Sequence, residues 1–239
     1  MSIAGSASLS LIDRRGSGKE LLFRNSALRI ADLAIRRAWF SGGIEWNIGQ
    51  LGHTFTTCDD LFVAVMDTAE GQFLRCFEYE RCKGLYWSVD FHLPDGDDFL
   101  SCYVRIVNRK DVPVPFYWWT NAAVPEVHGL RIFSGSAEII YIQPSSLASD
   151  AVAKCMAHGT LPFLPDIREG ADFSYPESFS DYSNEYFFQN NASLDETWEA
   201  ASYPDGWVYF DRSSERLQYR KMFCWGGLRG GRHWRDYLS

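Results

Sequence analysis

The stretch FLSCYVRIV, residues 99–107, is the clearest strand signal in the sequence and decides its fold class. Its side chains alternate, with Leu100, Cys102, Val104 and Ile106 on one face and polar or aromatic residues on the other. A period of two residues is typical of a β-strand that packs one face against a core.

Three comparable stretches precede it, rich in aromatic and β-branched residues: LFVAVM (61–66), QFLRCFEYE (72–80) and LYWSVDFHL (85–93). The connectors TAEG, RCKG, PDGDD and NRKD are short and carry turn-forming residues. EIIYIQ, residues 138–143, predicts one more strand. Successive strands without intervening helices argue against a parallel α/β sheet. We therefore predict an all-β fold containing an antiparallel meander.

The rest of the chain is less regular. Residues 145–159 predict one short helix, with Ser149 as its cap and Gly159 as its end. Residues 160–201 are weakly periodic and rich in aromatics, so we expect them to pack across another surface. Because the sequence contains neither a repeat nor a clear linker, we predict a single domain over residues 1–239.

Composition and charge exclude several classes of function. A net charge of −8 argues against nucleic-acid binding. The sequence has no apolar run long enough to span a membrane and no signal peptide. Its six cysteines form neither a C-x-x-C pair nor a Cys/His cluster, so we expect free thiols, no metal and a cytoplasmic location. Nothing in the sequence points to a nucleotide, flavin or other cofactor.

The segment GGIEWNIGQLGHT, residues 42–54, is the first candidate for a binding site. We read in it neither a helical period nor a strand alternation, so it is either a structural loop or the wall of a site. Glu45 stands between Ile and Trp, where a buried carboxylate is costly without a partner. Asn47 and His53 can bond hydroxyl groups and Trp46 can stack on a sugar ring, although a lone histidine is more often structural.

A second candidate segment is PFYWWTNAAVPE, residues 115–126. As a strand, it places Tyr117 and Trp119 on one face. Asn121 can then reach a ligand hydroxyl, or it can satisfy the local backbone in a doubly buried strand. Near the C-terminus, Arg232 lies in a glycine-rich turn that matches no phosphate-binding pattern. It is a surface residue of the turn, or a cleft residue if the turn folds inward.

Four segments taken together resemble a bacterial family of unknown function within the galactose-mutarotase-like superfamily, some members of which precede tetratricopeptide repeats. The resemblance extends over nearly the whole chain. The segments are LAIRRAWFSGGIEWNIGQLGHT (33–54), YWWTNAAVPE (117–126), DFSYPESFSDYSNEYFF (172–188) and KMFCWGGLRGGRHWRDYL (221–238).

This resemblance implies a β-supersandwich, in which large antiparallel sheets bind carbohydrate on a concave face. Mutarotases of the superfamily use a histidine acid, which follows an asparagine, and a glutamate base nearer the C-terminus. Here Asn121 is retained, Ala122 stands where that histidine would be, and the chain ends before the glutamate position. We therefore expect a partial domain that lacks edge strands at both termini, with exposed edges through which a homodimer can form.

The sequence thus predicts a carbohydrate-binding or carbohydrate-processing domain. Glu45 and His53 would act as an acid/base pair, in an epimerisation or in glycoside cleavage with Asp90 or Glu126 as a second carboxylate. The alternatives are a non-catalytic module that recognises a glycan or a protein, and a fragment that is inactive alone. The expected substrate-binding residues are Trp46, Asn47, Trp119, Asn121 and Arg232.

Overall fold

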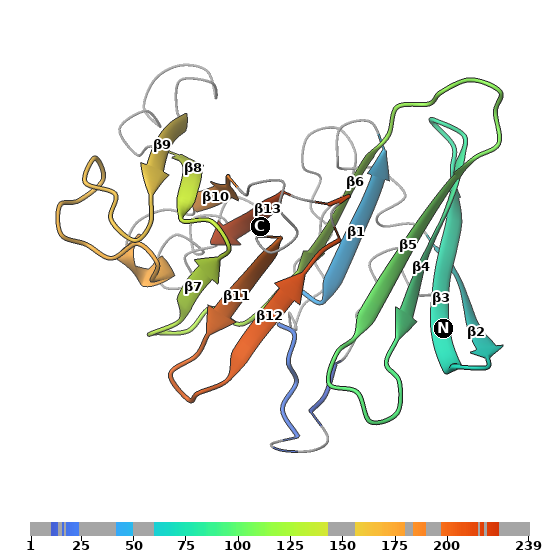
Figure 1. Ribbon diagram of the computed structural model, residues 1–239, viewed down its shortest axis with the longest axis horizontal. Helices are drawn as coiled ribbons and strands as arrows, with labels where there is room; N and C mark the ends of the chain where they lie inside the picture. Colours follow the sequence, from blue (N-terminus) through green and yellow to red (C-terminus); the bar gives the residue numbers. More distant parts are fainter. Residues whose placement is uncertain are drawn as a thin grey trace. The chain divides into compact units, whose positions relative to one another are not determined.

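A computed structural model describes ten segments of the chain (Figure 1). They are residues 11–13, 16, 18–23, 42–49, 60–142, 156–179, 184–189, 197–214, 216–217 and 219–224. The regular elements in these segments are β-strands in antiparallel sheets, apart from one short 3-10 turn, η4 (Pro176–Ser178). The prediction of an all-β fold is therefore confirmed. Within the same segments, no helix is long and apolar enough to cross a membrane.

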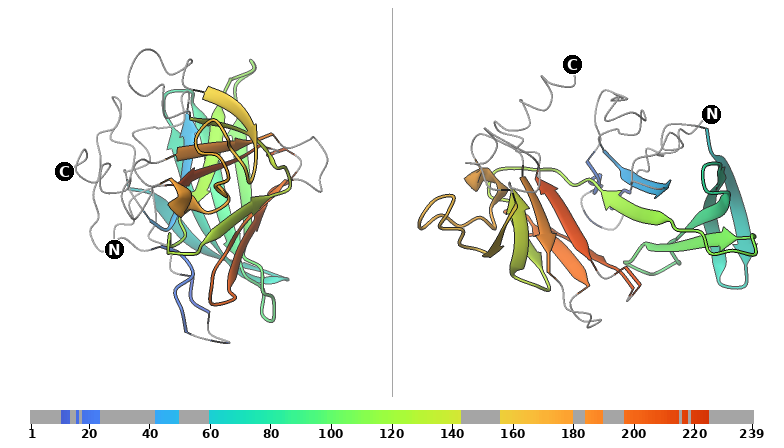
Figure 2. Two further views of the ribbon diagram at one scale, coloured as in Figure 1. Left: turned by 90° about the vertical axis from the view of Figure 1, so that its left-hand side faces the viewer. Right: turned by 90° about the horizontal axis from the view of Figure 1, so that it is seen from above.

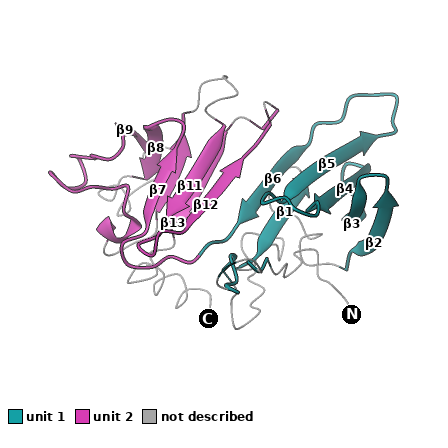
Figure 3. Cartoon of the chain, turned by 60° about the horizontal axis from the view of Figure 1, so that its bottom comes forward, with its two compact units in different colours: residues 1–124 teal, residues 125–239 magenta. Residues whose placement is uncertain are grey.

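The chain divides into two compact units, residues 1–124 and 125–239 (Figure 3). The described residues of the first unit form six strands in two sheets, ordered β2-β3-β4-β5 and β1-β6. These strands are β1 (Ile44–Gly49), β2 (Phe62–Thr68), β3 (Gly71–Glu80), β4 (Leu85–His92), β5 (Ser101–Asn108) and β6 (Tyr117–Ala122).

The sheet β2-β3-β4-β5 is the antiparallel meander that the sequence predicts. Its tight turns use glycines with positive φ, Gly71 at 113° and Gly84 at 69°, a region that other residues rarely adopt. At the second turn the buried Glu80 carboxylate accepts hydrogen bonds from the backbone N–H groups of Cys82 and Lys83, at 2.8 and 2.6 Å. This carboxylate satisfies donors that the turn would otherwise leave unpaired.

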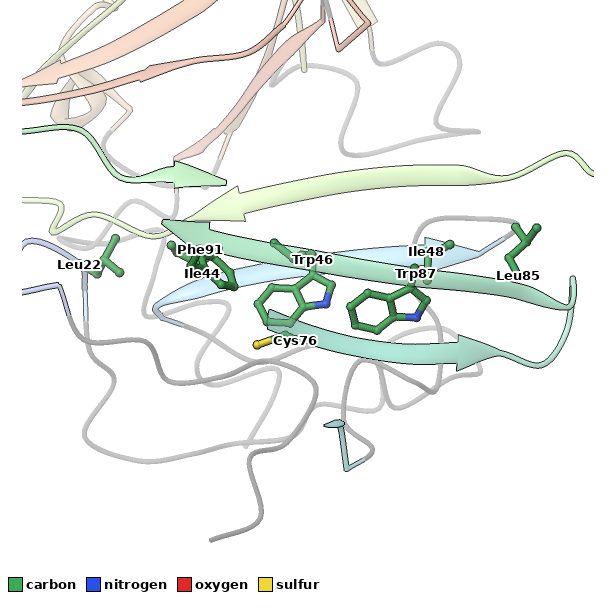
Figure 4. Packing of buried hydrophobic residues seen from close by; sticks show 9 residues of the cluster. Leu22, Ile44, Trp46, Ile48, Cys76, Leu85, Trp87 and Phe91 are labelled. Atoms are coloured by element: carbon green, nitrogen blue, oxygen red, sulfur yellow. The ribbon is translucent and has the colours of Figure 1, made fainter. Parts of the chain in front are cut away.

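The core of the first unit lies between the meander and the β1-β6 pair (Figure 4). Trp46 on β1 meets Trp87 and Phe91 on β4, with ring centroids 6.0 and 5.7 Å apart. Trp118 on β6 packs on Trp87 from 6.1 Å. The buried members of this cluster are Leu22, Ile44, Trp46, Ile48, Cys76, Leu85, Trp87, Val89 and Phe91.

Two expectations about local structure are wrong. Residues 44–49 form a strand, because Ile44, Trp46 and Ile48 alternate with Glu45 and Asn47 and so present an apolar face to the core. The flanking glycines obscure this alternation in the sequence.

The second local expectation was a helix over residues 145–159. Its C-terminal part is instead extended, in strand β9 (Met156–Thr160). Residues 143–155 lie outside the described segments.

The second unit contains the sheets β13-β10-β8-β9 and β12-β11-β7 (Figures 1 and 2). Its core includes Phe173 and Phe179 from the aromatic segment 160–201, which packs on strands as expected. The Asn184 amide continues a sheet ladder, donating to the Ile142 carbonyl at 2.9 Å and accepting from the Ile142 N–H at 3.2 Å. The remaining strands are β7 (Arg131–Ser134), β8 (Glu138–Ile142), β10 (Asn184–Phe188), β11 (Trp198–Ser202), β12 (Val208–Arg212) and β13 (Arg220–Cys224).

Candidate functional site

The antiparallel pairing of β1 and β6 brings the two candidate sequence segments together. Glu45 lies opposite Asn121, and Asn47 lies opposite Trp119. Residues directly opposite each other in an antiparallel pair share a face, so these four side chains form one group on the side of the ladder away from the core. We call this surface the Glu45 face. Tyr117, opposite Gly49, completes it.

Glu45 is the chemically distinctive residue of this face, because only 5% of it is exposed. The amide Nδ2 of Asn47 donates a hydrogen bond to Oε1 of Glu45 at 2.8 Å. Burial raises the pKa of the Glu45 carboxyl from 4.5 to about 7, and hydrogen bonds from the Asn47 and Asn121 side chains oppose this rise. A carboxyl group with such a pKa can donate or accept a proton at neutral pH.

Two aromatic rings lie further along the same face, at the positions opposite Asn47 and Gly49. Trp119 is half-buried and Tyr117 is exposed, with ring centroids 6.0 Å apart and planes at 66°. Asn121 is also exposed. The Glu45 face therefore combines a buried acid, one buried and one exposed amide, and accessible ring surface.

Trp46 does not belong to this group. Its side chain points to the opposite face of β1 and is 2% exposed, enclosed by Trp87 and Phe91 (Figure 4). No face of its ring is open to a ligand, so we correct its expected role from sugar stacking to core packing. The reason is the strand alternation of β1, which puts Trp46 and Glu45 on opposite sides.

The two carboxylates considered as partners of Glu45 have different positions. Asp90 lies on the outer face of β4, and the hydrophobic core separates it from the Glu45 face. Arg75 holds it through two hydrogen bonds of 2.7 Å each, so Asp90 has a structural partner. We therefore discard Asp90 as a second catalytic carboxylate, whereas Glu126 belongs to the second unit. The predicted site residues His53 and Arg232 lie outside the described residues.

The second unit contains an acidic side chain that the sequence does not single out. Glu199 on β11 lies opposite Asp211 on β12, and Nη2 of Arg220 is 2.7 Å from Oδ1 of Asp211. Burial raises the pKa of Glu199 to about 7; Arg220 lowers it and Asp211 raises it. In the sequence, Glu199 is one charged residue in the short strand WEAAS, and no motif surrounds it.

Comparison with known proteins places the chain in a family. Residues 2–141 match the family described as a domain of unknown function, DUF5107. The chain belongs to this family. The matched residues include all of the first unit except Met1, and all of the described Glu45 face.

A solved structure resembles the fold. It is the crystal structure of a TPR-domain-containing protein from Parabacteroides distasonis, with a TM-score of 0.66 and 18% sequence identity. The alignment covers 93% of this chain and 39% of that one, so this DUF5107 chain spans well under half the length of the protein that it matches. At this level of identity the likeness extends to the fold alone.

Proposed function

We propose that this DUF5107 domain binds a carbohydrate on the Glu45 face. The observation that carries the proposal is the grouping of a carboxyl with a pKa of about 7, two amides and an indole ring on one side of a two-stranded ladder. Amides and carboxyls bond pairs of sugar hydroxyls, because each hydroxyl both donates and accepts. Aromatic rings present a flat apolar surface to the C–H face of a pyranose.

The resemblance of the four sequence segments to the galactose-mutarotase-like superfamily supports the same ligand class. In that superfamily an asparagine precedes the catalytic histidine, and Asn121 occupies this asparagine position. Ala122 occupies the histidine position, and its side chain packs against the core of the first unit. The acid of a mutarotase is therefore missing at this place, which argues against an unchanged mutarotase mechanism.

Glu45 is the group that would carry proton transfer if the domain is an enzyme. Its raised pKa leaves it partly protonated near neutral pH, so it can act as an acid or as a base at a sugar carbon or ring oxygen. His53, eight residues further along the chain, is the partner that we propose for it. The reaction class would be epimerisation, or glycoside cleavage if a second carboxylate is available.

A non-catalytic recognition module is the second candidate. It is favoured by the similarity to a much longer protein, because the alignment with this chain covers only 39% of that protein. In such an arrangement the domain recognises a glycan or a protein and supplies no chemistry of its own.

One substitution separates the two candidates, provided that a bound sugar is first identified. Glu45→Gln keeps the shape and the hydrogen-bonding capacity of the side chain but removes its titratable proton. In an enzyme, this variant loses at least about a hundredfold in turnover and keeps its sugar affinity within a few-fold. The readout is exchange NMR of the two anomers of the bound sugar, together with product analysis for the corresponding glycosides. Equal rates of anomer exchange in wild type, Glu45→Gln and buffer, with no product from the glycosides, would exclude the enzyme candidate. The non-catalytic recognition module would then remain.

A further inference from the structure

A cavity lies in the first unit, on the outer face of the meander. It has a volume of about 440 Å³, within the range of about 300–1,000 Å³ that is common for small-molecule sites. The hydrophobic core separates it from the Glu45 face, so a ligand in this cavity would bind whether or not the Glu45 face has the function proposed above. The cavity is lined by Thr68, Ala69, Glu70, Phe73, Asp90, His92, Ser101 and Tyr103.

The charged groups of this cavity favour a neutral ligand. The Arg75 guanidinium neutralises Asp90 through a two-pronged pair, with Nε and Nη2 each 2.7 Å from a carboxylate oxygen. The same guanidinium lies 5.3 Å from the centroid of the Phe73 ring, so a cation already occupies that ring. A second cation would be repelled by Arg75, and an anion would be repelled by Glu70. The Arg75 pair uses only two of the roughly four acceptor positions of the Asp90 carboxylate.

His92 also lines the cavity. Nε2 of His92 is buried and has no hydrogen-bond partner in the part of the chain that the structure describes. Its ring is held edge-on against Phe73, with centroids 6.5 Å apart, and Ser101 lies directly opposite it in the ladder. Because Nε2 is shielded from solvent, a ligand in the cavity meets other atoms of His92 and not Nε2.

Tyr103 supplies the remaining feature that a sugar requires. It lies opposite Asp90 on the neighbouring strand and is 66% exposed, so a face of its ring is open to a ligand. An exposed ring beside a fixed carboxylate and an imidazole matches the alternating apolar and hydroxyl surfaces of a pyranose.

We propose that this cavity is a second carbohydrate-binding site, which takes one neutral sugar residue stacked on Tyr103, with its hydroxyls bonded to Asp90 and its edge packed beside His92. The site involves no covalent step. Together with the Glu45 face, this site would let the domain bind two sugar residues of one glycan, or two glycan chains at once.

The test uses the intact chain labelled with ¹³C and ¹⁵N in histidine. The chain has five histidines, and the His92 imidazole signal is assigned by its absence from the His92→Gln variant. The probes are glucose, galactose, mannose and their β-linked disaccharides, titrated into wild type, Tyr103→Ala and Asn121→Ala. Tyr103→Phe keeps the ring and serves as the matched control.

The expected result is a saturable shift of the His92 signal with at least one probe. Tyr103→Ala weakens the affinity read from this signal by about fivefold, whereas Tyr103→Phe and Asn121→Ala leave it within about twofold. A His92 signal that no probe moves, or that moves equally in Tyr103→Ala, overturns the proposal. Asn121→Ala alters only the Glu45 face. The titration therefore tests sugar binding in the cavity independently of sugar binding at the Glu45 face.

Discussion

Asn47 donates a hydrogen bond from Nδ2 to Oε1 of Glu45 at 2.8 Å, and the two side chains lie two residues apart on one face of β1. Both are buried, at 1% and 5% exposure. The amide favours the ionised carboxylate, while burial favours the neutral acid more strongly. The protonation state of Glu45 near neutral pH thus depends on a neighbour that can be changed by substitution.

Removing this amide should raise the pKa of Glu45 further. In Asn47→Ala the carboxyl stays buried and loses one hydrogen bond to its charged form, so the pKa moves above about 7. The measurement is the ¹³C shift of the glutamate side-chain carboxyl followed with pH, with Tyr117→Phe on the same face as control. A pKa that stays the same or falls in Asn47→Ala would contradict the electrostatic description of this site.

Glu45 should also make stability depend on pH. Its folded-state pKa of about 7 lies above the ordinary 4.5, so the folded state holds the proton more tightly than the unfolded state. Its contribution to stability is therefore fully present below about pH 4.5 and is lost as pH rises through about 7. Relative to Glu45→Gln, wild type should lose up to about 3 kcal/mol between about pH 4.5 and pH 8 in urea unfolding. A stability difference between the two proteins that does not vary with pH would show that Glu45 titrates normally.

The two tryptophans considered for sugar stacking should differ in their effect on stability. Trp46→Ala removes a buried ring between Trp87 and Phe91 and should cost about 3–5 kcal/mol of unfolding free energy. Trp119→Ala removes a half-buried ring and should cost clearly less, below about 2 kcal/mol. Urea denaturation followed by circular dichroism compares them, and equal costs would contradict the assignment of Trp46 to the core.

Removing only one partner of the Arg75–Asp90 ion pair should lower the free energy of unfolding more than removing both partners. Arg75→Met leaves the Asp90 carboxylate, whose side chain is 12% exposed, without its partner and should cost about 1–3 kcal/mol. Arg75→Met with Asp90→Leu should recover part of that loss, because no buried charge remains. Arg105→Met, at an exposed position of the same sheet, is the control. A double variant less stable than Arg75→Met would contradict this account.

Strand β2 should mediate self-association. Within the described residues it is the end strand of its sheet, and Phe62 and Val65 on its two faces are 60% and 64% exposed. Exposed apolar edges of this kind pair with other strands unless a charge blocks them. We expect a concentration-dependent dimer by analytical ultracentrifugation that Val65→Lys weakens. A sedimentation coefficient that is constant with concentration would exclude pairing through β2.

The meander could be predicted from the sequence because its strands carry a local signal. FLSCYVRIV alternates, and three of its four predicted inward residues (Leu100, Val104 and Ile106) pack on the core. The turn residues between the strands match the observed hairpins. Local periodicity and turn chemistry are sufficient to define such elements.

The site was only partly predictable, because it depends on pairing between distant segments. Glu45, Asn47, Trp119 and Asn121 were identified from their residue types, but the register that unites them joins strands about seventy residues apart in sequence. The alternation in IEWNIG is hidden between its glycines, which is why Trp46 was expected to bind substrate and not to pack in the core. Glu199 and the cavity beside Tyr103 have no sequence signature, since both arise from packing of neighbouring strands.

The central claim is that the Glu45 face binds sugar, and a fluorescence titration tests it most directly. Trp119 lies on this face, whereas no tryptophan is among the described residues that line the cavity beside Tyr103. The part of an emission change that is lost in Trp119→Ala therefore reports on the Glu45 face. Mono- and disaccharides are titrated into wild type, Trp119→Ala and Asn121→Ala, with Tyr103→Ala as control.

We predict a saturable change in wild type for at least one sugar. This change is lost in Trp119→Ala and needs about fivefold more sugar in Asn121→Ala, while Tyr103→Ala behaves as wild type. Emission that stays flat across the whole panel, or that saturates identically in Asn121→Ala and wild type, would contradict sugar binding at this face.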